Sequence, residues 1–165
     1  MLVDVQRGLF RRSRPVYGEQ ALLDTICALI TRARRARAPV IYTQHTHRSV
    51  LASGSMEWQL HPRLQTEPGD VIVCKRHGSA FRDTALIEAL EARGITILVV
   101  AGLVTHGCVR ATCVDGSELG YHIVLVADGH SNYQDDGAAF IKSWNERLGS
   151  RPNVELQPAH DVAFE

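Results

Sequence analysis

Short apolar runs alternate with amphipathic stretches along the whole chain. The apolar and β-branched runs predict strands over residues 1–6, 40–44, 70–75, 95–102, 121–128 and 153–157. Apolar residues at helical spacing, with capping and turn residues at their ends, predict helices over residues 19–37, from Asp83 or Thr84 to Gly94, over 108–119, and from Asp135 or Asp136 to Gly149. This alternation predicts an α/β fold: a three-layer α/β/α Rossmann-like sandwich with a six-stranded, mainly parallel sheet, in a single domain over 1–165.

Two segments refine this picture. Residues 95–102 are apolar at both odd and even positions, as expected of a strand that helices cover on both faces. The polar stretch 45–69 contains Gly54, Pro62, Pro68 and Gly69, so we expect a long surface loop there or a loop with a short helix.

Composition and charge exclude several classes of protein. Lys+Arg and Asp+Glu both number 18, so the net charge gives no reason to expect nucleic acid or an anionic membrane as a partner. No apolar run approaches the ~18 residues that a membrane span needs, and no signal peptide precedes the first strand. The four cysteines show no CxxC spacing. We therefore expect a soluble, cytoplasmic protein with reduced thiols.

Reactive side chains follow three of the predicted strands. Asp4 ends the first strand, Lys75 ends the third, and Cys108 lies in the loop after the long central strand. Because ligand sites in open parallel sheets form beyond the carboxyl ends of the strands, these residues are candidates for one site. The alternatives are a small buried cysteine, an aspartate that caps the next segment and a solvated lysine.

The three residues form a coherent chemical set. A helix N-terminus and the Lys75 cation would both favour the thiolate of Cys108. Asp4 could accept the thiol proton and return it to a leaving amine if burial raises its pKa. Backbone N–H groups of the loop would stabilise the oxyanion that forms when sulfur attacks a carbonyl.

Three segments resemble motifs of the isochorismatase-like hydrolases, also called the cysteine hydrolase superfamily. They are "LVDVQRGLF", "VIVCKRHGSAF" and "VAGLVTHGCVRATCVDGSELGY". The resemblance implies that Cys108 is the nucleophile, that Asp4 shuttles the proton and that Lys75 orients the pair. It also implies a cis peptide between Leu103 and Val104, with the N–H groups of Val104 and Cys108 as the oxyanion hole.

The sequence departs from the metal-binding members of this family at "QHTHR", where they have Asp-x-His. His45 and His47 could bind zinc together with His61 in the next loop. The favoured alternative is that these histidines line the pocket or its rim and that no cofactor is needed. His106 stands where many relatives have an acidic residue, which would change the charge beside the nucleophile.

The resemblance predicts hydrolysis of a small amide or ureido C–N bond through a thioester-type intermediate. Phe10, His47, Trp58 and Phe81 are candidates for the pocket wall, and a neutral or weakly polar amide is favoured over a polyanion. Vinyl ether hydrolysis of isochorismate is the enzymatic alternative, and binding or oligomer assembly without catalysis is the other. Relatives are usually dimers or tetramers, so we also expect a homo-oligomer.

Overall fold

The computed structural model describes residues 1–164, and its six strands form one sheet in the order β3-β2-β1-β4-β5-β6. The strands are β1 (Leu2–Val3), β2 (Ile41–His45), β3 (Val71–Lys75), β4 (Ile97–Leu103), β5 (His122–Ser131) and β6 (Val154–Gln157). All neighbouring strands run parallel. The predicted fold class is confirmed, and the sheet is wholly rather than mainly parallel.

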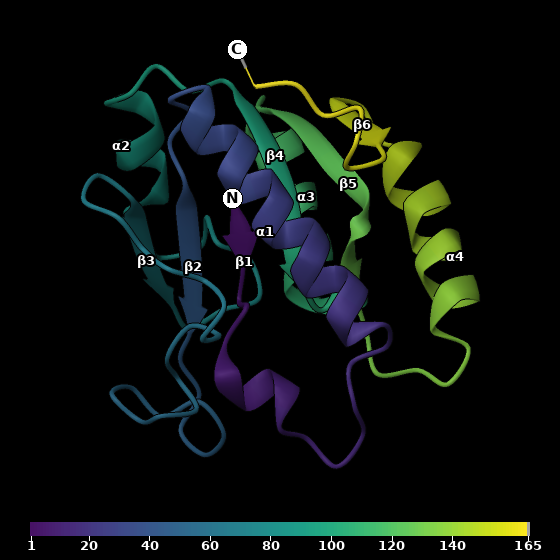
Figure 1. Cartoon of the computed structure of the whole chain (residues 1–165). Coiled ribbons are helices and arrows are strands. Elements are labelled where there is room, and N and C mark those ends of the chain that lie inside the picture. Colours follow the sequence, from purple (N-terminus) through teal and green to yellow (C-terminus); the bar gives the residue numbers. More distant parts are fainter. Residues whose placement is uncertain (165) are drawn as a thin grey trace.

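Helices cover both faces of this sheet (Figure 1). They are α1 (Glu19–Arg35), α2 (Leu86–Glu91), α3 (Arg110–Glu118) and α4 (Gly137–Gly149). The apolar face of α1 packs in one core with β1 and β5, whereas α2, α3 and α4 contribute to a second core on the opposite face. Residues of β4 enter both cores, as its apolar sequence predicts.

The first strand is much shorter than the predicted 1–6 because its backbone turns away at Asp4. Asp4 has φ +52°, a left-handed conformation that costs a non-glycine residue about 1–3 kcal/mol. Its N–H donates to Thr43 Oγ1 at 3.1 Å, and its carbonyl accepts from the N–H of Gln6 at 2.8 Å. Asp4 therefore lies just outside β1, and a short 3-10 helix over Arg7–Phe10 follows the turn.

A glycine lets β1 lie close against β4. Gly102 pairs with Val3 and has φ +131°, and a Cβ atom on it would collide with the Val3 backbone. Only glycine combines that φ with that close approach. Gly102 therefore helps to place Asp4 beside the end of β4.

The end of β5 and the start of α3 also differ from the predictions. β5 continues to Ser131, three residues beyond the predicted 128, after an irregularity where β4 pairs with it between Val100 and Gly102. α3 begins at Arg110 instead of 108, because a π-helical turn over Thr105–Val109 precedes it. Cys108 thus lies in this turn rather than in the first turn of the α-helix.

The 45–69 segment is a loop without an α-helix, and it packs beside the chain that follows β1. Gln6 pairs with Leu60 in an isolated bridge, and the Gln6 amide donates to the carbonyls of His45 and Trp58 at 3.0 and 2.7 Å. The loop and the segment after β1 lie together beyond the carboxyl ends of the strands. Within residues 1–164, no helix has the length and apolar character required to cross a membrane.

Candidate active site

The carboxyl ends of β1 and β4 meet where the strand order reverses, and the candidate residues gather there. Asp4 follows β1, while Cys108 lies in the π-helical turn just after β4. The carboxylate of Asp4, the thiol of Cys108 and a ring nitrogen of His45 lie within 4.8 Å of one another. The reversal point is where open α/β sheets leave a crevice, so this grouping lies where a ligand site is expected.

Asp4 and Lys75 form a buried ion pair. Asp4 Oδ2 lies 2.7 Å from Lys75 Nζ, and the two side chains are 1% and 0% exposed. Asp4 Oδ1 accepts a hydrogen bond from Thr43 Oγ1 at 2.5 Å. The carboxylate is therefore held at both oxygens, by an ammonium on one side and a hydroxyl on the other.

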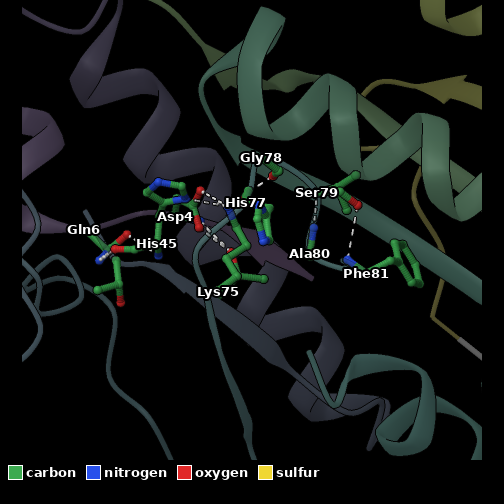
Figure 2. A network of polar contacts seen from close by, with 12 residues as sticks. Asp4, Gln6, His45, Lys75, His77, Gly78, Ser79, Ala80 and Phe81 are labelled. Atoms are coloured by element: carbon green, nitrogen blue, oxygen red, sulfur yellow. Dashed lines mark hydrogen bonds and ion pairs between the residues drawn. The ribbon is translucent and has the colours of Figure 1, made fainter. Parts of the chain in front are cut away.

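Lys75 reaches Asp4 across the end of β2, which lies between β3 and β1 (Figure 2). Its Nζ donates to the carbonyls of His77 and Gly78, each at 3.1 Å, and lies 3.2 Å from Nδ1 of His45. Together with Asp4 these groups surround the ammonium with four acceptors for its three protons, so they cannot all accept at once. Burial and the neighbouring Lys75 lower the pKa of His45, which favours an uncharged ring beside the ammonium.

The Cys108 thiol is more basic than the sequence suggested. Burial is the largest cause and the adjacent Asp4 carboxylate the next, and together they raise the pKa of Cys108 to about 12, although Lys75 acts in the opposite direction. This shift runs opposite to the one expected from a helix N-terminus and a cation, and it favours the protonated thiol.

The turn that carries Cys108 is anchored through Thr105 to a buried polar chain. Thr105 Oγ1 lies 2.9 Å from Nδ1 of His130 and 2.9 Å from the Ser131 carbonyl oxygen, while His130 Nε2 lies 2.8 Å from Asn145 Oδ1. Burial lowers the pKa of His130, which favours the uncharged ring. The π-helical turn that carries Cys108 is thereby linked to β5 and α4.

The peptide between Leu103 and Val104 is cis, as expected. Val104 begins the π-helical turn, and its carbonyl accepts hydrogen bonds from the N–H groups of Gly107 and Val109 at 3.0 and 3.3 Å. The roles of the Val104 and Cys108 N–H groups toward an oxyanion remain a prediction.

A cavity of about 230 Å³ opens above the cluster. Its walls are formed by Asp4, Leu9, Arg12, His45, His47, Val50, Leu51, Leu103, Val104, Cys108 and Tyr133. His47 therefore borders the cavity, as the sequence predicted. Most of the remaining wall is apolar, which is typical of small-molecule sites.

The other three predicted pocket residues lie elsewhere. Phe10 packs against the ring of His61 with the ring centroids 4.7 Å apart. Trp58 packs against the core and donates its indole N–H to Thr46 Oγ1 at 3.0 Å. Phe81 is buried in the second core and stacks on Tyr121. Their side chains are used for packing, so the prediction that they line the cavity is wrong.

His106 also does not face the cavity. Its exposed ring meets the edge of Phe140 on α4, with the centroids 5.2 Å apart. Any effect of His106 on Cys108 must therefore act at a distance.

The donors around Asp4 do not suit zinc. Asp4, His45 and Cys108 are close enough to share an ion, but the Lys75 ammonium already contacts Asp4 and the Nδ1 of His45. A zinc ion would be repelled by that buried cation. Nδ1 of His47 contacts Ser49 Oγ at 3.0 Å, and neither His47 nor His61 belongs to the cluster. His47 borders the cavity, as the favoured alternative expects, whereas His61 does not and packs against Phe10.

A family model described as the Isochorismatase domain matches residues 1–146. The chain belongs to the isochorismatase family. A crystal structure of another isochorismatase family protein, 29% identical, superposes with a TM-score of 0.87 and covers 94% of this chain and 95% of that one.

Two named relatives share the sequence more closely over shorter lengths. Streptothricin hydrolase from Streptomyces noursei is 34% identical over 143 residues, which cover 86% of this chain and 52% of that protein. Ureidoacrylate amidohydrolase RutB from Methylobacterium radiotolerans is 40% identical over 79 residues, covering 48% of this chain and 31% of that protein. The chain thus spans about half or less of the length of these relatives.

Several residues at the site of this isochorismatase-family chain have no clear signal in the sequence. Thr43 is buried inside β2 and contacts Asp4, but a threonine in a strand gives no signal of that kind. Arg12 and Tyr133 enter from segments that were interpreted only as connections. Tyr133 follows the carboxyl end of β5, and that position is the one signal that could have marked it.

Proposed function

We propose that this chain hydrolyses a small amide or ureido C–N bond, with Cys108 as the nucleophile. The observation that carries the proposal is the meeting of Asp4, Lys75 and Cys108 beneath one cavity. An ion pair this deeply buried contributes weakly to stability at best, because desolvation offsets its attraction, so its placement beside a thiol favours a chemical role. The names of two relatives, an amidohydrolase and a streptothricin hydrolase, support the same class of reaction.

The first half of the proposed reaction forms a thioester. Cys108 Sγ attacks the carbonyl carbon, the carbonyl electron pair moves to oxygen, and the thiol proton passes to the Asp4 carboxylate. Because the pKa of Cys108 is raised to about 12, the proton stays on sulfur until attack, and Asp4 acts as a general base. The C–N bond then breaks, and the leaving nitrogen takes the proton from Asp4.

The second half releases the acid. Water attacks the thioester carbon and gives a proton to Asp4, the C–S bond breaks, and the sulfur regains that proton. Lys75 stays protonated throughout and holds the carboxylate in place, while the N–H groups of Val104 and Cys108 stabilise the oxyanion in both halves. The proposal uses no metal ion, because Lys75 occupies the place next to Asp4 and His45 that a cation would need.

An ammonia-release screen across primary amides, ureides and nicotinamide tests this function. We expect release with the wild type and with Cys74→Ala, a control in which an exposed thiol is removed, and a loss of at least about 1,000-fold with Cys108→Ala. Equal release by wild type and Cys108→Ala would exclude the nucleophile. Hydrolysis of a vinyl ether but of no amide would replace the proposed substrate class.

A further inference from the structure

One cation in the cavity wall has no partner of opposite charge. The Asp4 carboxylate is the acidic group of that wall, and it is paired with Lys75. Arg12 is exposed and forms no ion pair with any residue of 1–164. The cavity therefore presents one unneutralised guanidinium within a largely apolar wall.

A rigid aromatic surface supports this guanidinium. Arg12 Cζ lies 5.1 Å from the ring centroid of Tyr133, and the Tyr133 hydroxyl donates to the carbonyl oxygen of Leu9 at 2.8 Å. The hydrogen bond holds the ring, and the ring face attracts the cation. Stacking leaves the N–H edge of the guanidinium available, and that edge matches the two oxygens of a carboxylate.

Charge is also unevenly distributed around the cavity. Residues 5–17, which connect β1 to α1, contain four arginines and no acidic residue, although the whole chain has a net charge of zero. The segment lies beyond the carboxyl ends of β1 and β2, on the same side of the sheet as the turn that follows β4 (Figure 1). A positive field at the entrance attracts small anions and raises their local concentration.

We infer that the cavity selects substrates that carry a carboxylate, bound by Arg12, at the end opposite the scissile amide or ureido carbonyl. The inference rests on the proposed function and gives its substrate class: amidic or ureido acids rather than neutral amides. It replaces the preference for neutral amides that the sequence suggested. Arg12 would be the specificity-determining residue, and Tyr133 would position it.

Matched substrate pairs test this inference. Succinamate and succinamide differ in one carboxylate, as do N-carbamoyl-β-alanine and its carboxamide. At pH 8, where an ordinary histidine is neutral, we expect the wild type to prefer the acid of each pair by 10-fold or more in kcat/KM. Arg12→Gln should reduce this ratio to about 1–3, mainly by raising KM for the acid.

The matched control is Arg11→Gln, which removes the neighbouring charge. Arg11 does not line the cavity, and its Nη1 contacts Met56 Sδ at 3.6 Å. Arg11→Gln should retain most of the acid preference, because a local contact and not the overall charge provides it. A wild type without acid preference, or an Arg12→Gln variant that keeps it, would overturn the inference.

Binding separates this inference from the proposed reaction. Calorimetry with Cys108→Ala should detect succinamate but not succinamide, and Arg12→Gln in the same background should weaken succinamate binding about 10-fold or more. If the acid binds through Arg12 but no amide is hydrolysed, the proposed function fails and the ligand class stands. If amides are hydrolysed and Arg12→Gln binds succinamate as well as its parent, the ligand class fails and the function stands.

Discussion

Asp4 and Lys75 meet in the protein interior at 2.7 Å, with the lysine side chain crossing the end of a strand to reach the carboxylate. Breaking such a pair leaves an uncompensated buried charge, which typically costs 3–5 kcal/mol. We therefore expect Lys75→Met to lower the free energy of unfolding by about that amount, measured by urea denaturation.

The double variant Asp4→Asn/Lys75→Met is the control for that loss. Asparagine tolerates the left-handed backbone at position 4, and the double variant leaves no unpaired charge. It should be more stable than Lys75→Met alone by about 1–3 kcal/mol. If the losses of unfolding free energy in Asp4→Asn and Lys75→Met simply add up to the loss in the double variant, the two residues do not interact.

Thiol reactivity should respond to Asp4 in the direction opposite to turnover. The Asp4 carboxylate helps to raise the pKa of Cys108 to about 12, and the thiolate is the species that iodoacetamide alkylates. Asp4→Asn removes that carboxylate and keeps Lys75, so alkylation of Cys108 near pH 8 should accelerate while amide hydrolysis is lost. Peptide mass spectrometry measures the labelling, with exposed Cys74 as the internal reference.

In the wild type, Cys108 should be labelled more slowly than Cys74 at neutral pH. The labelling rate of Cys108 should increase as the pH rises above about 9. Labelling and turnover that fall together in Asp4→Asn would contradict the stated cause of the raised pKa.

Alkaline stability should depend on a second buried thiol. Burial raises the pKa of Cys113 from 9.0 to about 12. A folded-state pKa above the unfolded value means that the stabilising contribution is present below pH 9 and is lost between about pH 9 and 12. Cys113→Ala should therefore be less stable at neutral pH but should lose stability less steeply over this range. Urea midpoints at several pH values test this, and an unchanged slope would refute it.

The Thr105–His130 contact should be needed for both folding and turnover. Thr105→Val keeps the shape of the side chain but leaves the His130 Nδ1 without its partner, which should cost about 1–3 kcal/mol. Because Thr105 lies in the turn of Cys108, kcat should fall more than KM rises. Thr31→Val is the matched control, since its exposed hydroxyl contacts only its own helix, and should change stability by less than about 0.5 kcal/mol. A Thr105→Val enzyme with normal kcat would limit this contact to a structural role.

The sequence predicted the layers of the fold because periodicity and turn residues are local signals. Strand and helix assignments were correct to within a few residues, except at β1 and β5, where Asp4 turns the backbone early and a sheet irregularity prolongs pairing to Ser131. Because ligand sites in open parallel sheets form at the carboxyl ends of the strands, the sequence alone predicted that Asp4, Lys75 and Cys108 lie at one edge of the sheet.

Properties that depend on distant packing were not predictable in this way. The basicity of Cys108 follows from burial and from the Asp4 oxygen beside it, whereas the sequence indicated only the helix and the lysine. The position of Phe81 in the loop after a predicted strand suggests a pocket aromatic, yet its ring stacks on Tyr121 in the second core. Arg12 lies in the segment that connects β1 to α1, and no local sequence pattern predicts that this segment passes the cavity.

The most direct measurement is the mass of the enzyme during its first turnover. Wild type is mixed with an amide that it hydrolyses, quenched in acid within milliseconds and analysed intact and after digestion. The account predicts an added acyl group on the peptide that contains Cys108, sensitive to hydroxylamine and absent in Cys108→Ala, which also fails to release ammonia. Ammonia release by Cys108→Ala at the wild-type rate, or an acyl group on another residue, would contradict it.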